Sequence, residues 1–440
     1  MIPDKIEVNI AGGLDVELPR MVRVRQKFES VEIDDVAGAV IEQFKDASLR
    51  EKIKPGMKIA VGCGSRGIAN VAECVRTVID QLKALGAEPF IFPAMGSHGS
   101  ASAEGQVKVL SSLGISEKTM GCPIKSSMDV VELGQLDNGM PVYFDKHAAE
   151  ADAVALVCRV KAHTNFRAPI ESGIVKMLVI GMGKIRGAST VHWYGFDAFI
   201  DVLPATAQHV MDKINFLFGV AMVENAEDRT ALVEVVPGEE VLEREPDLLS
   251  MSRQWMPRLQ FDDIDVVIVD RMGKNITGAG MDPNIMGRNA RGTNWDAVPR
   301  IKKIAVLGLT PETDGNATGV GMADVTTMRL FRQFDPAKTY ANVIAATLLD
   351  GAAIPMIMNT DREAVQLAAK TIPQTRPEEA TFVHIPNTLE IVDIDVSENL
   401  LPYIKANPDK FEIIGEPRPL EFDADGNLTP MPTHGAKGDE

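Results

Sequence analysis

The stretch KIAVGCGSRGIANVAECVRTVIDQLKALGAEPFIFPAMGSHG, residues 58–99, decides the fold class of this chain. Lys58–Gly62 and Pro89–Pro93 are short apolar runs, which are typical of buried strands. Between them, Asn70–Leu85 has the periodicity of an amphipathic helix, and Gly86 marks its end. Two strands joined by a helix through short loops form a βαβ unit, so the sequence predicts a parallel sheet.

The rest of the chain extends this pattern. Ala153–Val160 is a further buried strand, and it leads directly into KAHTNF. A second α/β pattern begins near Phe261 with the strand DDIDVVIVD and continues with a strand at Lys303–Leu309. Helices are expected at Val343–Ala352 and Asp361–Ile372. We therefore predict an α/β protein made of two α/β domains with mainly parallel sheets.

The length of 440 residues is too great for one ordinary hydrophobic core. We place an N-terminal catalytic and cofactor domain at residues 1–250 and a C-terminal α/β domain at residues 251–416. The polar, Glu-rich segment that begins at Pro237 is interpreted as the connection between them. Residues 417–440, rich in Pro, Gly and Asp, are expected to form an extended tail.

Composition excludes several classes of protein. The net charge of −17 argues against nucleic acid as a partner, so an anionic substrate would need a local basic pocket. The four cysteines, Cys63, Cys74, Cys122 and Cys158, form no CxxC pair, which favours a reducing, cytoplasmic setting. The start of the chain has no apolar signal segment, and no apolar run is long enough for a membrane span.

Polar and titratable residues follow three of the predicted strands and continue into the next segment. They are Ser65, Arg66, Ser97, His98, Lys161, His163, Asn165, Lys176 and His192. In open parallel sheets the ligand site lies beyond the carboxyl ends of the strands, so we expect these side chains to meet in space. Each also has a structural explanation: Arg66 could pair with a surface acid, and Lys176 could extend its charge to the edge of the sheet.

Lys176 lies in an almost unbroken apolar run, GIVKMLVIG, 16 residues before His192. A lysine rarely occupies such a setting without a partner or a reaction. Desolvation lowers the pKa of an amine and makes it nucleophilic. The pattern therefore marks Lys176 as a candidate for covalent chemistry.

Three glycines follow this lysine with the spacing GxGxxxG, which hints at a dinucleotide loop: Gly181, Gly183 and Gly187. The acidic residue expected at the end of a following strand is missing, because the sequence after it is helical. We interpret these glycines as tight-turn residues. An NAD-type oxidoreductase remains an alternative function that rests on this spacing.

The order SR, GSHG, KAH, GIVK and VH, with its spacings, resembles the lactate racemase family of nickel-pincer enzymes over about residues 58–195. The resemblance implies a two-domain α/β fold with the active site in the inter-domain cleft. It implies a cytoplasmic isomerase that racemises or epimerises a small anionic 2-hydroxy acid by reversible hydride transfer. The cofactor would be nickel pyridinium-3,5-bisthiocarboxylate mononucleotide, made by separate biosynthesis proteins. We expect the protein to have no nucleic-acid or membrane partner.

The same resemblance assigns roles to individual residues. Lys176 would be joined covalently to the cofactor, and His192 would be the protein ligand of nickel. His98 and His163 would be the catalytic acid–base groups on either face of the substrate. Arg66 would be catalytic as well, because it would lie near both substrate and cofactor.

Other contacts and departures complete this set. Ser65, Arg66, Ser97 and Lys184 would also contact the cofactor. Cys63 stands where the family has an acid, and the loop after Lys176 lacks the expected proline turn, so Lys184 is a rival for the covalent link. The 16-residue gap to His192 favours Lys176.

Two further assignments stay open. Lys274 and Asn275, in the Gly-rich loop GKNITGAGMDPN, could bind the substrate carboxylate. A protein of the same fold that binds a small acid or a nucleotide without catalysis is also compatible with the sequence.

Overall fold

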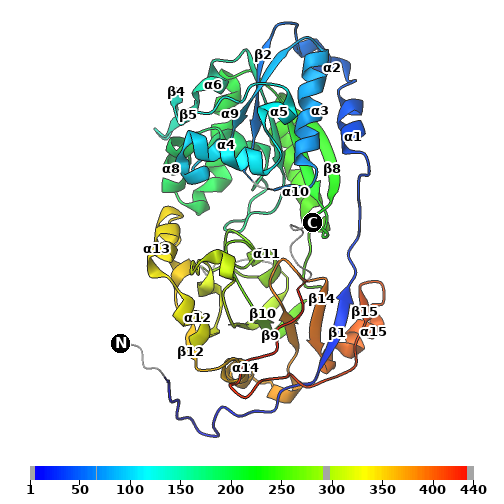
Figure 1. Ribbon diagram of the computed structural model, residues 1–440, viewed down its shortest axis with the longest axis vertical. Coiled ribbons are helices and arrows are strands. Elements are labelled where there is room, and N and C mark those ends of the chain that lie inside the picture. The colour runs from blue at the N-terminus through cyan, green and yellow to red at the C-terminus, as the bar shows by residue number, and fades with distance from the viewer. Residues whose placement is uncertain (1–4, 66, 291–297, 434–440) are drawn as a thin grey trace. The chain divides into compact units, whose positions relative to one another are not determined.

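The computed structural model describes residues 5–65, 67–290 and 298–433, which form two compact units (Figure 1). One unit contains Glu29–Met256, and the other combines Met1–Phe28 with Pro257–Glu440. The predicted first domain therefore differs from the observed unit at both ends. Its first 28 residues belong to the other unit, because β1 (Met21–Gln26) pairs there with β14 (Asp393–Ser397).

The unit of residues 29–256 is built on a five-stranded sheet of order β3-β2-β6-β7-β8. Neighbouring strands are parallel except for the last pair. The strands are β2 (Lys58–Cys63), β3 (Glu88–Pro93), β6 (Ala153–Arg159), β7 (Phe216–Glu224) and β8 (Thr230–Pro237). Helix α3 (Val71–Ala84) joins the first two strands, so the predicted βαβ unit is confirmed. The candidate site lies at the carboxyl edge of this sheet.

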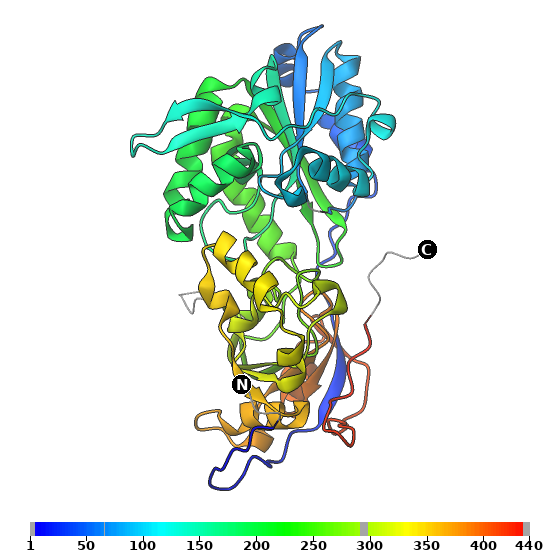
Figure 2. The same cartoon turned by 60° about the vertical axis from the view of Figure 1, so that its left-hand side comes forward.

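Helices cover this sheet, and a separate hairpin of β4 (Val130–Gln135) and β5 (Pro141–Asp145) projects from the unit (Figure 2). The remaining helices are α1 (Val36–Gln43), α2 (Ala47–Lys52), α4 (Ala103–Ser112), α5 (Glu117–Met120), α6 (Lys146–Ala149), α7 (Ile174–Lys176), the π-helical turn η2 (Met177–Gly181), α8 (Lys184–Trp193), α9 (Phe199–Lys213) and α10 (Val241–Trp255). The helical elements α7, η2 and α8 follow β6 after the loop of residues 160–173, and a turn at residues 182–183 separates η2 from α8.

The sequence predicted that the Glu-rich segment after Pro237 connects the two domains. The structure shows that it does not. It forms helix α10, which belongs to the unit of residues 29–256 and contacts β7 and α7. Its apolar side chains Val241, Leu248 and Leu249 are buried, so burial of one face outweighs the polar composition of the segment.

Of the three glycines in the GxGxxxG spacing, Gly183 lies in the turn between η2 and α8, whereas Gly181 ends η2 and Gly187 lies within α8. None of them has a positive φ. A Cβ atom on Gly181 would lie 2.8 Å from the carbonyl oxygen of Ala94, and one on Gly183 would lie 2.5 Å from that of Val179. These two glycines therefore allow the backbone to approach neighbouring segments closely.

The other unit has an eight-stranded mixed sheet of order β12-β11-β10-β9-β13-β14-β1-β15. The first five strands are parallel and the last three antiparallel. The strands not yet given are β9 (Asp263–Val269), β10 (Arg300–Val306), β11 (Val325–Thr327), β12 (Met356–Met358), β13 (Phe382–Ile385) and β15 (Phe411–Ile413). Together, the two sheets confirm the predicted α/β class with mostly parallel strands.

The helices of this unit are short: α11 (Pro283–Met286), α12 (Met328–Gln333), α13 (Pro336–Ala345), α14 (Asp361–Lys370) and α15 (Leu401–Ala406). The predicted helix at Val343–Ala352 is wrong as a single element. Helix α13 ends at Ala345, and Thr347 takes a positive φ of 55° before the 3₁₀ turn Leu349–Ala352 begins. A left-handed residue cannot continue a right-handed helix.

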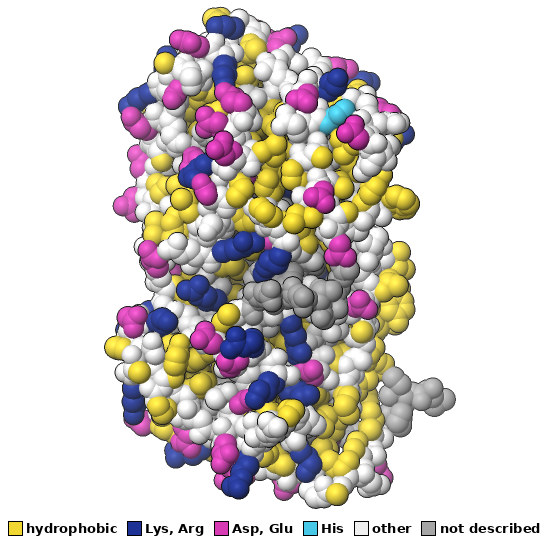
Figure 3. Space-filling model, turned by 180° about the vertical axis from the view of Figure 1, so that it is seen from behind, with side chains coloured by type: hydrophobic (Ala, Val, Ile, Leu, Met, Phe, Trp, Pro, Cys, Tyr) yellow, Lys and Arg dark blue, Asp and Glu magenta, His cyan; other side chains and the backbone are white. Residues whose placement is uncertain are grey.

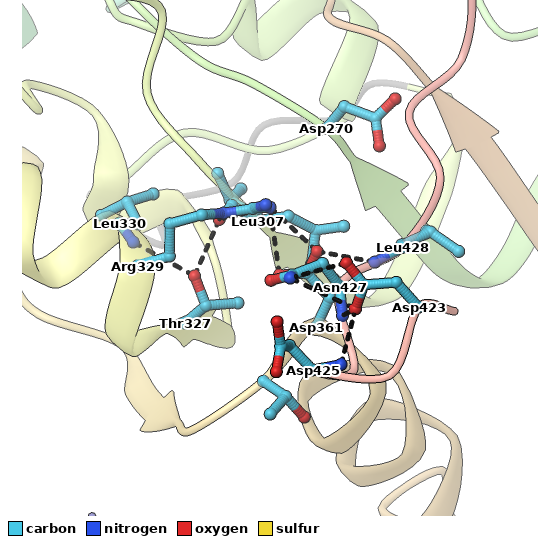
Figure 4. Close-up of polar contacts among 12 residues, drawn as sticks. Asp270, Leu307, Thr327, Arg329, Leu330, Asp361, Asp423, Asp425, Asn427 and Leu428 are labelled. Atoms are coloured by element: carbon cyan, nitrogen blue, oxygen red, sulfur yellow. Dashed lines mark hydrogen bonds and ion pairs between the residues drawn. The ribbon is translucent and has the colours of Figure 1, made fainter. Parts of the chain in front are cut away.

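After Pro417 the chain does not form the simple extended tail that the sequence predicted: it turns back at residues 423–427, so that Phe422 pairs with Leu428. Two buried carboxylates hold it to this unit (Figure 4). Asp361 accepts a hydrogen bond of 2.9 Å from the backbone N–H of Leu428, and Asp270 accepts one of 2.8 Å from that of Met431. Both apolar side chains are buried. The segment up to residue 433 is therefore part of the folded unit.

The surface carries charges of both signs (Figure 3). No helix in residues 5–65, 67–290 and 298–433 combines the length and apolar character needed to cross a membrane.

Candidate active site

Predicted site residues follow β2 and β3 at the carboxyl edge of the first sheet. Ser65 lies two residues after β2, and Ser97 and His98 lie just after β3. The hydroxyl of Ser65 is hydrogen-bonded to Nδ1 of His98, so the structure joins two loops that the sequence separates by 33 residues. Ser97 and His98 are exposed. Arg66, predicted beside them, lies outside the described residues.

The loop that carries His98 is shaped by two glycines and one buried amide. Gly96 and Gly99 have φ angles of 57° and 64°, a region that side chains with a Cβ rarely adopt. Gln106, fully buried on α4, donates to the carbonyl oxygens of Gly96 at 3.1 Å and of His98 at 3.3 Å. The buried amide of Gln106 therefore fixes the backbone at His98, while the ring of His98 remains at the surface.

Lys184 supports the same loop from inside the protein. Its ammonium is fully buried and lies 2.6 Å from the carbonyl oxygen of Pro93, 3.1 Å from Oε1 of Gln106 and 3.0 Å from Oδ2 of Asp145. Burial lowers the pKa of this amine, and Asp145 opposes that shift. Two of these oxygens accept hydrogen bonds, the third forms an ion pair, and the side chain has no exposed surface, which argues against the cofactor contact predicted for Lys184. We interpret it as a structural lysine.

The turn after β6 places His163 by its backbone. Glu171 is fully buried, and its carboxylate accepts hydrogen bonds from the N–H groups of His163 at 2.7 Å and Ala168 at 3.0 Å. Arg253 from α10 donates to the same carboxylate at 2.5 Å. The ring nitrogen Nδ1 of His163 accepts from the N–H of Asn165 at 3.0 Å, so in the neutral ring the proton is on Nε2.

The imidazole of His163 is held neutral by its surroundings. Its centroid lies 4.6 Å from that of Phe166 and 5.7 Å from that of Phe196. Burial lowers the pKa of His163 well below the ordinary value, and the nearby charges of Lys176 and His192 lower it further. A neutral ring with Nε2–H is a hydrogen-bond donor at the site.

His192 is on α8, and its orientation is fixed by its own helix. Nδ1 of the ring donates to the carbonyl oxygen of Ala188, one turn earlier, at 2.7 Å. Phe196 and Phe199 pack edge-on against the ring at centroid distances of 5.6 and 5.4 Å. Burial lowers the pKa of His192, and Lys176 lowers it as well. The neutral ring therefore has a lone pair on Nε2, in the tautomer that metal-binding histidines use.

Lys176 completes this cluster. It is the last residue of α7, is half-buried, and is followed at once by the π-helical turn η2, a feature that often occurs at functional sites. The rings of His163 and His192 both pack against Phe196, at centroid distances of 5.7 and 5.6 Å, and the charge of Lys176 lowers the pKa of each ring, so the amine lies near both. The structure thus brings together three of the predicted residues.

Sequence reasoning missed Glu245, a buried carboxyl behind Lys176. Its Oε2 accepts from the N–H of Val175 at 2.8 Å, and its Oε1 faces Gly173, where a Cβ atom would lie only 2.5 Å away. Desolvation raises the pKa of Glu245 to about 7. A signal was present, because Val241, Glu245 and Leu248 have the i, i+4, i+7 spacing of one buried helical face.

Lys274 and Asn275 lie in the other unit, in the loop after β9. Nζ of Lys274 donates to the carbonyl oxygen of Gly278 at 2.6 Å, and Oδ1 of Asn275 accepts from the hydroxyl of Thr310 at 2.6 Å. The substrate-binding role of these residues and the inter-domain cleft stay predictions.

The donor set was tested against the nickel cofactor. Among the residues that the structure describes, no group of three or more His, Cys, Asp or Glu side chains is placed to hold a metal ion. His192 instead offers one imidazole lone pair beside an amine, which fits a metal that takes its other ligands from an organic cofactor.

Comparison with known proteins adds two matches. Residues 6–196 match the family model of the lactate racemase N-terminal domain. The fold is similar to that of the lactate racemase apoprotein from Thermoanaerobacterium thermosaccharolyticum, with a TM-score of 0.52 and 12% identity over 87% of this chain and 96% of that one. A search of curated protein sequences found no match.

Proposed function

We propose that the chain is an isomerase that racemises or epimerises a 2-hydroxy acid, on the premise that residues 6–196 match the family model of the lactate racemase N-terminal domain. The observation that carries the proposal is the cluster of Lys176, His163 and His192. Two neutral rings and one amine share this neighbourhood, and the tautomer of each ring is set by a backbone hydrogen bond.

We propose that Lys176 is joined to nickel pyridinium-3,5-bisthiocarboxylate mononucleotide and that Nε2 of His192 is the protein ligand of its nickel. When bound, this group supplies the acceptor and donor for a hydride at the 2-carbon of the acid. The hydrogen bond from His192 to Ala188 supports the assignment, because a metal-binding histidine is commonly oriented by its second ring nitrogen. Ser65, Ser97 and Arg66 are proposed to contact the cofactor from the loops after β2 and β3.

His98 and His163 are proposed to move the hydroxyl proton of the substrate, one on each face of the reacting carbon. Their settings differ. Ser65 can either donate to or accept from Nδ1 of His98, so both neutral tautomers are open to that ring. His163 presents Nε2–H, and it can accept a proton there only after giving up its hydrogen bond with Asn165.

The two alternatives are weaker. The alternative of an NAD-type oxidoreductase rests on Gly181, Gly183 and Gly187. Two of these, Gly181 and Gly183, are explained by the close approach of backbone carbonyl oxygens. A non-catalytic binding protein would have the same cluster, so only chemistry separates it from an isomerase.

The test is to produce the protein together with nickel-pincer biosynthesis proteins. Intact and peptide mass spectrometry would locate an adduct, elemental analysis would measure nickel, and chiral chromatography would follow single enantiomers of several 2-hydroxy acids. The proposal expects an adduct on Lys176, nickel that depends on His192, and formation of the opposite isomer. An exposed lysine on α4, Lys108, changed to Ala is the matched control. Protein that carries no adduct, or that leaves every acid unchanged, would contradict the proposal.

A further inference from the structure

Helix α10 contacts both turns that carry the cluster, through two side chains eight residues apart, Glu245 and Arg253. Eight residues are just over two helical turns, so the two side chains point about 80° apart around the helix axis and reach two neighbouring turns of the chain. Each is bonded to a different turn: Glu245 to the turn of Lys176, and Arg253 to the turn of His163.

The first contact fixes the backbone immediately before Lys176. Glu245 is fully buried, and its Oε2 accepts the N–H of Val175 at 2.8 Å. Its Oε1 lies against Gly173, where the backbone is extended with a φ of −177°. Any residue can adopt that φ, so the absence of a side chain at residue 173 serves the carboxyl group and not the backbone.

The second contact acts through Glu171. Arg253 donates to Oε1 of Glu171 at 2.5 Å and to the carbonyl oxygen of Ala168 at 3.3 Å. The other oxygen of Glu171 accepts the N–H of His163 at 2.7 Å, and Arg167 lies 3.6 Å from it. A carboxylate this deeply buried needs a countercharge, so Arg253 stabilises the group that holds His163.

We propose that α10 is a positioning element of the active site, in which Glu245 fixes the turn of Lys176 and Arg253, through Glu171, fixes the turn of His163. The roles of these two targets rest on the proposed function, whereas the positioning itself does not. Neither Glu245 nor Arg253 is proposed to touch substrate or cofactor.

The experiment uses the full chain without cofactor and two local readouts. Hydrogen exchange is followed by mass spectrometry for peptides that cover residues 161–171 and 173–182. Acetylation of Lys176 by an N-hydroxysuccinimide ester is timed against that of the other lysines. The variants are Glu245→Ala, Glu245→Gln, Gly173→Ala, Arg253→Ala and Arg253→Lys, and the control is Glu243→Gln, an exposed position on the same helix.

Glu245→Ala is expected to speed exchange in 173–182 and acetylation of Lys176 by about tenfold, because a hydrogen bond to a charged group is lost. Gly173→Ala is expected to do the same from the other side of the contact. Glu245→Gln keeps an acceptor and should recover most of the protection. Arg253→Ala should speed exchange only in 161–171, and Arg253→Lys should recover part of it, because lysine keeps the charge but not the two-donor geometry.

In loaded enzyme, Glu245→Ala is expected to lower kcat by about 10- to 100-fold with a smaller change in KM, since misplaced groups mainly affect the reacting geometry. The positioning role is overturned if Glu245→Ala and Gly173→Ala both leave exchange in 173–182 unchanged, or if both raise exchange equally across the whole unit. If wild-type protein isomerises no hydroxy acid, the proposed function fails while the exchange results still decide the positioning role.

Discussion

Two lysines eight residues apart, one at the end of α7 and the other at the start of α8, have opposite surroundings. Lys184 is fully buried and its ammonium is matched by three oxygens, including the carboxylate of Asp145. Lys176 is half-buried, and its charge acts on the rings of His163 and His192. The first amine holds the fold together around the His98 loop, and the second faces groups able to do chemistry.

The difference teaches that burial alone does not mark a reactive lysine. The more deeply buried amine of the pair is the one whose three oxygen partners all lie within the protein. Partial burial leaves the amine of Lys176 accessible beside two neutral imidazoles. The predictions below test this contrast between Lys176 and Lys184.

The largest effect is expected from Lys176→Ala. We expect no covalent adduct in peptide mass spectra and no detectable isomerisation, because the residue proposed to hold the cofactor is gone. The melting temperature should change little, since the side chain is only half-buried. An adduct that survives in this variant, or that maps to Lys184, would reverse the assignment.

Lys184→Met should have the opposite profile. Removing one partner of a buried ion pair leaves Asp145 uncompensated, which costs about 3–5 kcal/mol of the free energy of unfolding. Denaturant unfolding would measure the loss, and the double variant Lys184→Met/Asp145→Leu should recover part of it. Protein that remains folded should still carry the adduct on Lys176. A loss below about 1 kcal/mol would mean that the buried pair is not structural.

Much of the fold could be predicted because its signals are local. The strands at Lys58–Cys63 and Ala153–Arg159 are short apolar runs, and helix α3 has clear periodicity and a terminal glycine. The partners of β1 could not be predicted, because a strand of six residues contains no information on which sheet it joins. Helix α10 was missed because its many charged residues conceal a narrow buried face.

The candidate site could be predicted only in part, for a similar reason. His98, His163, Lys176 and His192 follow strands or occupy unusual apolar settings, which are visible in the sequence. The residue that distinguishes Lys184 from Lys176 is Asp145, which lies on a distant hairpin and carries no local mark. Tertiary contacts of this kind decide pKa values and tautomers, and spacing along the chain does not encode them.

Glu245→Gln tests whether the buried carboxyl group beside the Lys176 turn makes the stability of the protein depend on pH. The folded-state pKa of Glu245 is about 7, above its ordinary value of 4.5, so the folded protein binds this proton more tightly than the unfolded chain does. The stabilising contribution is complete below pH 4.5 and is lost as the pH rises through about 7. Wild type should therefore lose on the order of 3 kcal/mol relative to the glutamine variant between pH 4.5 and pH 8. Parallel stability curves for the two proteins from urea unfolding would show that Glu245 does not titrate in this range.

The smallest effect is expected from Ser65→Ala, which changes the His98 loop that Lys184 supports. The variant removes the hydroxyl bonded to Nδ1 of His98, but Gln106 still holds the backbone of that loop through Gly96 and His98 itself. A single exposed hydrogen bond contributes about 1 kcal/mol, so kcat should fall by roughly fivefold with no change in the melting temperature. Gln106→Ala should exceed this, because it removes two loop contacts and leaves the ammonium of Lys184 short of an acceptor. Steady-state kinetics on both enantiomers would measure each variant. If Ser65→Ala lowers kcat more than Gln106→Ala does, then the activity depends on the orientation of the His98 ring and not on the support that Lys184 gives to its loop.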